Sequence, residues 1–117
     1  MTFTERRRSH RTPVDFFVEE TRGDRTWLHP ATSLSTDGLY VLVSDDRVAL
    51  DPTQLMALAF TLPSGTAVRT SARIAYGDDR HGQRGIGLQF VDLDPDAHGA
   101  IRAYVTAASH TRMRAAL

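Results

Sequence analysis

The first residues of the chain hold a cluster of arginines whose charges could bind an anion. Arg6, Arg7, Arg8 and Arg11 place four guanidinium groups within six positions. Like charges repel at this spacing, whereas a planar guanidinium binds phosphate or a guanine edge through two parallel hydrogen bonds. Arg7 and Arg11 stand four residues apart, so a turn or a short extended arm could direct both at one target. Taken alone, the cluster is more simply explained as a solvated N-terminal arm.

A second polar segment, from Ser33 to Gly38, lies between two strand-like stretches. It reads Ser-Leu-Ser-Thr-Asp-Gly and offers hydroxyl groups beside a glycine. Glycine gives the backbone the conformational freedom that a loop needs. Serine in such a loop either contacts a ligand or hydrogen-bonds its own backbone as an ST-turn, and both interpretations are open for Ser33.

The two segments together resemble the PilZ domain family, whose members bind the bacterial second messenger cyclic di-GMP. The family pairs an RxxxR element with a D/N-x-S-x-x-G loop. Arg7 and Arg11 fill the arginine positions, Ser35 and Gly38 fill the serine and glycine, and Ser33 stands where the family usually has Asp or Asn. A Gly85-Ile-Gly-Leu-Gln-Phe90 segment is also similar to a strand found late in these domains, so the resemblance covers nearly the whole chain.

The resemblance implies a ligand-binding role for each of these residues. Arg7 and Arg11 would clamp phosphate and guanine, Ser35 would be a polar contact, and Gly38 would permit the turn. Arg6 would either contact a second, stacked ligand molecule or face solvent.

Position 33 bears on affinity, because a hydroxyl offers one oxygen where a carboxylate or amide offers two polar atoms. Losing one good hydrogen bond there predicts binding weaker by roughly 1 to 2 kcal/mol.

The implied function is that of a receptor, for which we expect no cofactor apart from cyclic di-GMP. Ligand binding would order the arginine-rich arm and pass the signal to an unidentified protein partner. Ser33 keeps an alternative open: a PilZ-like adaptor that binds no nucleotide and acts by protein contacts in motility or pilus function. A nucleic-acid-binding barrel is disfavoured, because the sequence lacks the exposed aromatic series that such platforms need.

Composition is that of one ordinary globular domain. The chain has 117 residues and 13.0 kDa, with 41% hydrophobic and 24% charged residues. Fourteen basic and fourteen acidic residues cancel, so there is no general attraction to nucleic acid. The absence of cysteine excludes disulfides and thiolate chemistry. With no signal-peptide core and no membrane-length apolar run, we expect a cytoplasmic protein without membrane insertion.

No catalytic constellation is evident, and we do not expect an enzyme. Asp92, Asp94 and Asp96 imitate the start of a calcium loop, but Ala97 stands where that loop needs glycine. The five histidines show no metal-ligand spacing, and no nucleophile motif surrounds Ser33 or Ser35. We therefore expect no metal site.

Alternation of apolar and polar residues predicts the strands that must position these groups. In the first strand, Val14, Phe16 and Val18 alternate with Asp15, Phe17 and Glu19. A hairpin turn is expected around Gly23, and Pro30 is expected to break the pairing after it. A polar turn is expected at 77–82, with Asp78 and Asp79 in it. The further strands are predicted at 25–29, 39–43, 55–62, 68–76 and 84–91.

Six strands at this spacing predict a mainly β protein, a small six-stranded antiparallel barrel with a C-terminal helix. Asp94 caps that helix and Pro95 suits its first turn. The apolar face comprises Ala97, Ile101, Tyr104, Val105 and Ala108. The residues around Arg112 to Arg114 are expected to fray. We predict a flexible arginine-rich arm over residues 1–12 and a PilZ-like barrel with its helix over residues 13–117.

Overall fold

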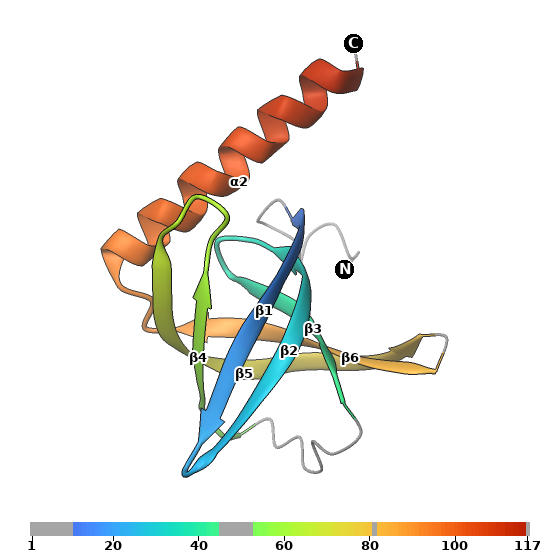
Figure 1. Ribbon diagram of the computed structural model, residues 1–117, viewed down its shortest axis with the longest axis vertical. Helices are drawn as coiled ribbons and strands as arrows, with labels where there is room; N and C mark the ends of the chain where they lie inside the picture. Colours follow the sequence, from blue (N-terminus) through green and yellow to red (C-terminus); the bar gives the residue numbers. More distant parts are fainter. Residues whose placement is uncertain (1–10, 45–52, 81, 117) are drawn as a thin grey trace.

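The computed structural model describes residues 11–44, 53–80 and 82–116. Six strands are followed by one helix in these residues (Figure 1). The strands are β1 (Thr12–Arg22), β2 (Arg25–Leu34), β3 (Gly38–Val43), β4 (Met56–Thr61), β5 (Ala67–Arg80) and β6 (Gln83–Val91). The helix is α2 (Pro95–Ala116).

The strands form a closed barrel in the order β1-β2-β3-β6-β5-β4, and every pairing is antiparallel. Closure comes from β1 and β4, which pair over only three residues each, from Glu19↔Ala59 to Thr21↔Ala57. The six-stranded antiparallel barrel with a C-terminal helix that the sequence predicted is confirmed.

Alternation along each strand separates the core from the outer surface. In β3, Leu39, Val41 and Val43 are buried, whereas Tyr40 and Leu42 between them are half-buried. In β6, Ile86 and Leu88 point into the barrel. The fully enclosed core also contains Val18, Leu34, Leu58, Phe60, Leu62, Val68 and Ala72.

Two hairpin turns each use a glycine with positive φ, and the first of them is the turn predicted around Gly23. Gly23 (φ 61°) lies between β1 and β2, and Gly65 (φ 101°) lies between β4 and β5. Side chains with a Cβ rarely adopt this region, so glycine is favoured at both positions. The second turn is closed by two backbone hydrogen bonds, which join Leu62 to Thr66 and Gly65.

Two predicted strand limits were wrong. β2 continues through Pro30, which pairs with Phe17 of β1, as far as Leu34. β5 continues through Gly77 to Arg80, so Asp78 and Asp79 lie in a strand and not in a turn. In both cases pairing with the neighbouring strand keeps residues in a β-strand although their local sequence favours a turn.

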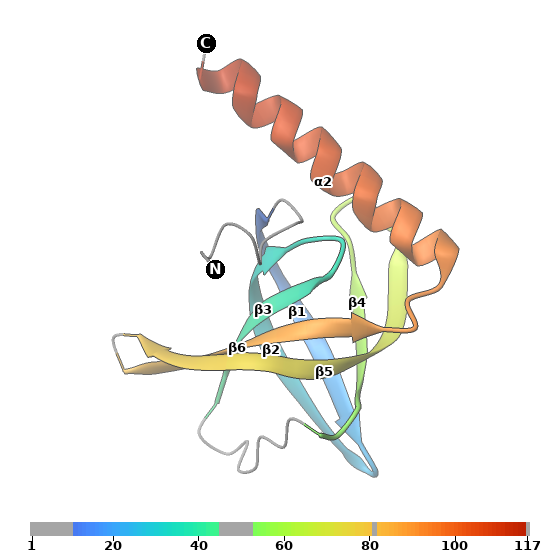
Figure 2. The same cartoon turned by 180° about the vertical axis from the view of Figure 1, so that it is seen from behind.

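The helix begins where its cap was predicted. Asp94 Oδ1 accepts a hydrogen bond from the backbone N–H of Ala97 at 2.8 Å. Ala97, Ile101 and Val105 are buried, and the helix lies across the barrel before extending beyond it (Figures 1 and 2). Its backbone stays helical to Ala116, so the expected fraying beyond His110 is not observed. Within the described part of the chain, no helix is long and apolar enough to cross a bilayer.

Candidate functional site

One row of residues crosses five strands on the outer surface of the barrel. Pro13 of β1 pairs with Ser33 of β2, and Ser33 pairs with Tyr40 of β3. Tyr40 in turn pairs with Gly87 of β6, and Gly87 pairs with Tyr76 of β5. We call these five residues the outer row. The core residues Leu34, Leu39, Val41, Ile86 and Leu88 are next to members of the row in sequence, and Tyr76 itself is exposed, so the row faces outward.

Arg11 lies beside this row. Its neighbour Thr12 is buried and pairs with Leu34, which places Arg11 next to the end of β2. The Arg11 guanidinium carbon lies 5.6 Å from the centre of the Tyr76 ring. A cation at this distance is attracted to the negative face of an aromatic ring. The start of β1 and the segment from Ser33 to Gly38, distant in sequence, are therefore neighbours in the fold.

The two tyrosines form a joined aromatic surface. The ring centres of Tyr40 and Tyr76 are 6.1 Å apart with a 31° tilt. The Tyr40 hydroxyl donates a hydrogen bond to the Asp78 carboxylate, which holds the ring in place. Tyr76 is 40% exposed, so its ring is partly available to a ligand.

Glycines on β6 make room for both rings. A Cβ at position 85 would stand 1.9 Å from the Tyr40 hydroxyl oxygen, and one at position 87 would stand 2.3 Å from Tyr76 Cε1. Real Cβ atoms do not approach other atoms this closely. Gly85 and Gly87 therefore leave a bare stretch of strand on which the tyrosines lie.

The turn between β2 and β3 is shaped by Ser35. Its hydroxyl oxygen accepts hydrogen bonds from the backbone N–H groups of Asp37, at 3.1 Å, and Gly38, at 3.2 Å. Its own N–H donates to the Gly38 carbonyl at 2.9 Å. The side chain is 7% exposed. Ser35 thus makes the local serine turn that the sequence suggested for Ser33.

Gly38 is required for a reason different from the one expected. Its φ is not positive, so backbone freedom is not at issue. A Cβ at this position would lie 1.9 Å from the backbone oxygen of Leu88. Only glycine lets β3 approach β6 this closely, and the Asp37 carbonyl next to it accepts the Phe90 N–H at 2.8 Å.

The predicted site residues are thus partly brought together. Arg11, Ser33, Ser35 and Gly38 lie at one end of β1, β2 and β3. Ser33 is half-buried within β2 and does not belong to the loop itself. Arg6 and Arg7 lie outside the described residues. No group of three or more His, Asp or Glu side chains in the described ranges could hold a metal ion.

The sequence prediction missed the two tyrosines. Tyr76 continues an alternation with Val68, Ala72 and Ile74, so a regular strand would place its side chain on the inner face. The register between β5 and β6 slips by one residue between Ile74 and Tyr76. A bulge of this kind turns the following side chain to the opposite face. The sequence signal for this arrangement was the pair of glycines at 85 and 87, which leave space for large side chains packed over β6.

The site therefore combines a guanidinium, aromatic faces and a hydroxyl on one open surface. Guanidinium groups bind phosphate, and aromatic rings stack on nucleobases. The arrangement is suited to holding a planar, anionic molecule.

Comparison with known proteins places this geometry in a family. The family model described as PilZ domain matches residues 5–107. No curated protein sequence matches the chain. Among solved structures, the Bacillus subtilis inhibitor of motility MotI/DgrA superposes with a TM-score of 0.82 at 15% identity, over 90% of this chain and 52% of that one.

Two further similar structures were solved with a ligand. The PilZ domain of Escherichia coli YcgR with c-di-GMP has a TM-score of 0.76 at 16% identity, covering 95% of this chain and 97% of that one. Borreliella burgdorferi PlzA in complex with c-di-GMP has a TM-score of 0.63 at 13% identity, covering 93% and 53%. The chain thus spans about half the length of MotI and PlzA and nearly all of the YcgR domain. From the match over residues 5–107 and the shared barrel, we conclude that the chain belongs to the PilZ domain family.

Proposed function

We propose that this PilZ domain is a cyclic di-GMP receptor that binds its ligand over the outer row. Arg7 and Arg11 clamp the phosphates and guanines, Ser33 is a polar contact, and Ser35 and Gly38 set the turn beside it. The observation that carries the proposal is the convergence of Arg11 with Ser33 and the exposed Tyr76 ring on one surface. Arg6 supplies a further contact when a second ligand molecule stacks on the first.

Tyr76 adds a role that the motifs alone do not include. Its ring is 40% exposed and already faces the Arg11 guanidinium. A guanine that stacks on this ring either displaces the Arg11 guanidinium from it or leaves the guanidinium in contact with both. Such stacking contributes about 1 to 3 kcal/mol per base. The c-di-GMP complexes of YcgR and PlzA, which share the fold, support this choice of ligand.

Signal transmission follows from the charge of the arm. The bound phosphates neutralise the repulsion among the arginines and fix the segment before β1 over the ligand. A partner protein then meets a different surface. The likeness to MotI, described as an inhibitor of motility, supports a role in motility. The protein acts in the cytoplasm, by binding and not by catalysis.

A second candidate is an adaptor that binds no nucleotide. It is favoured by one observation, the serine at position 33, which presents a single hydroxyl to the outer row. In this case the Arg11–Tyr76 contact only stabilises the fold, and a partner protein binds the outer row without any nucleotide.

Titration calorimetry with cyclic di-GMP tests the receptor proposal. We expect Arg7→Ala and Arg11→Ala each to weaken binding at least about tenfold, because a charge-assisted hydrogen bond contributes roughly 1.5 to 3 kcal/mol. Arg25→Ala is the matched control, since Arg25 stacks on Trp27 at the far hairpin. Equal heats from the wild type and both arginine variants would refute the clamp.

Substitution at position 33 separates the two candidates. We expect Ser33→Asp to strengthen binding by roughly 1 to 2 kcal/mol, because a carboxylate accepts from both donors of a guanine edge. Ser33→Ala serves as the control for a change of side chain without added acceptors. If neither the wild type nor Ser33→Asp binds cyclic di-GMP in the calorimeter, the adaptor function is the correct one.

A further inference from the structure

A second surface lies on the other side of the barrel, over β2, β1, β4 and the start of β5. Its centre is a cross-strand row in which Leu28 pairs with Glu19, Glu19 with Ala59, and Ala59 with Arg69. Phe17, two residues before Glu19, is 63% exposed, and so is Leu28. Large apolar side chains this exposed on neighbouring strands indicate a contact surface. We call this the Phe17 face.

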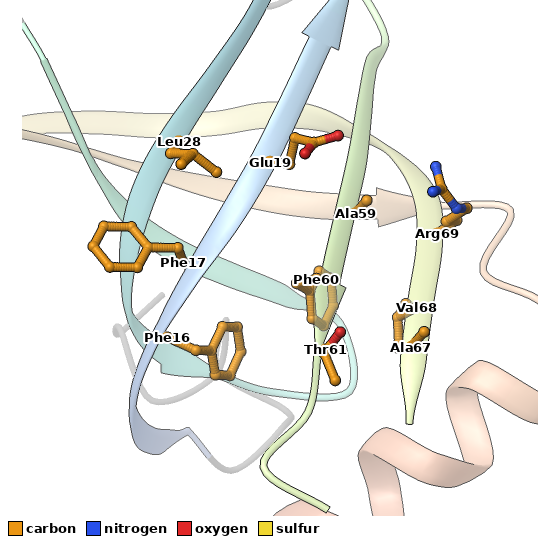
Figure 3. A pocket seen from close by; sticks show the side chains of 10 residues that line it. All are labelled: Phe16, Phe17, Glu19, Leu28, Ala59, Phe60, Thr61, Ala67, Val68 and Arg69. Atoms are coloured by element: carbon orange, nitrogen blue, oxygen red, sulfur yellow. The ribbon is translucent and has the colours of Figure 1, made fainter. Parts of the chain in front are cut away.

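The Phe17 face is hollowed along its middle. β1 and β4 pair from Glu19 to Thr21 and separate on the Phe17 side of that pairing (Figure 3). The stacked rings of Phe16 and Phe60, 5.6 Å apart, lie at this opening. The resulting groove of about 430 Å³ is lined by Phe17, Leu28 and the small residue Ala67 among others.

Charges of opposite sign flank the groove. Glu19 and Arg69 lie on either side of Ala59 in the same row, and both are exposed. Adjacent strands are about 4.8 Å apart, so the two charged residues stand about 10 Å apart across the face. Between them there is only a methyl group.

This pattern is self-complementary. Consider two copies of the chain related by a two-fold axis that lies between them and runs along β4 through Ala59. This axis places the β1 side of one copy over the β5 side of the other. It places Glu19 of one copy against Arg69 of the other, twice. β1 and β5 run in the same direction, because each is antiparallel to β4. The same axis therefore places Phe17, two residues before Glu19, against Ala67, two residues before Arg69.

We propose that the Phe17 face binds a second copy of this chain as a two-fold symmetric dimer. In an isologous interface the same surface of both copies must be complementary to itself. Here the Glu19 charge meets the opposite charge of Arg69, and the large Phe17 side chain meets the small Ala67. The outer row crosses β1 and β2 at Pro13 and Ser33, away from Glu19 and Leu28, and continues over β3, β6 and the far part of β5. Dimerisation therefore leaves Arg11 and Tyr76 open to ligand. The proposal does not depend on the ligand proposed above.

Sedimentation velocity of the full chain tests it without any ligand. We expect the mass to approach twice 13.0 kDa as concentration rises. Phe17→Ser removes the exposed ring and should give a monomer at concentrations where the wild type is dimeric. A wild-type chain that stays monomeric across the whole accessible concentration range overturns the proposal.

Charge reversal tests the geometry of the interface and does not rely on one variant folding well. Glu19→Arg or Arg69→Glu alone creates two like-charge contacts, and we expect each to raise the dimer dissociation constant at least about tenfold. The double variant exchanges the two charges and should restore dimerisation. Arg102→Glu, the same change on the exposed side of α2, should have no effect. Dimers that persist in both single variants, or a double variant weaker than both, would show that this face is not the interface.

Discussion

At the scale of single residues, the site depends on which positions carry no side chain. Gly38, Gly85 and Gly87 all have ordinary φ values, yet a Cβ at any of them would meet another atom at 2.3 Å or less. The clashing atom differs among them. At Gly38 it is a backbone oxygen, whereas at the other two it belongs to a tyrosine side chain. The cost of substitution depends on whether that atom can move.

Gly38→Ala should destabilise the fold, because the backbone oxygen of Leu88 cannot retreat without breaking the β3–β6 pairing. We expect a loss of roughly 1 to 3 kcal/mol in the free energy of unfolding, measured by urea denaturation. Gly99→Ala is the matched control, because nothing lies within 4 Å of its added Cβ. In a helix this change should add up to about 1 kcal/mol. Equal stabilities for the two variants would contradict the steric argument.

At the scale of elements, the β5–β6 hairpin builds the aromatic part of the site. The slip in register before Tyr76 puts its ring on the outside, and the bare strand opposite receives it. Neither strand would do this alone. A regular β5 would bury the ring, and a β6 with side chains at 85 and 87 would displace both tyrosines.

Gly87→Ala should separate ligand binding from stability. The three atoms nearest the added methyl group all belong to the Tyr76 ring, and Tyr76 is 40% exposed, so the ring can swing outward. We expect unfolding free energy to change by less than about 1 kcal/mol, while affinity for cyclic di-GMP falls by an amount near one base-stacking contact, about 1 to 3 kcal/mol. Calorimetry and urea denaturation on the same samples measure both.

Gly77→Ala is the control for that experiment, because its added Cβ would have only ordinary contacts, at 3.7 Å. If Gly87→Ala and Gly77→Ala bind the ligand equally well, Tyr76 is not part of the binding surface.

At the scale of the whole molecule, the seam that closes the barrel contains a buried polar pair. Glu20 pairs across the sheet with Trp27 on one side and Leu58 on the other. Its Oε1 lies 2.8 Å from Nε2 of His29, and both side chains are fully buried. The His29 Nδ1 atom has no hydrogen-bond partner among the described residues. The pair therefore links β1 and β2 inside a largely apolar core.

A double-mutant cycle measures that link. Glu20→Leu or His29→Leu alone removes the buried hydrogen bond between these two side chains and should cost about 1 to 3 kcal/mol in the free energy of unfolding. The double variant removes both polar groups, so it should be less destabilised than the sum of the single changes. Additive losses in urea denaturation would indicate that the two side chains do not depend on each other.

The architecture could be predicted from the amino-acid sequence, because alternation with period two, glycine turns and a capped helix are local signals. It predicted six strands, the Asp94 cap and the motifs that resemble a PilZ domain. It also named Arg11, Ser33, Ser35 and Gly38, although Ser35 proved to hold the turn and Gly38 proved to allow close strand contact.

Tertiary structure alone decided the rest, because those features arise from pairing between distant strands. Local propensity ended β2 at Pro30 and β5 at Gly77, whereas partners across the sheet carry both strands further. A slip of one residue, invisible in the alternation of β5, turned Tyr76 outward to meet Arg11. Which side chains share a surface depends on register, and register is a property of two strands together.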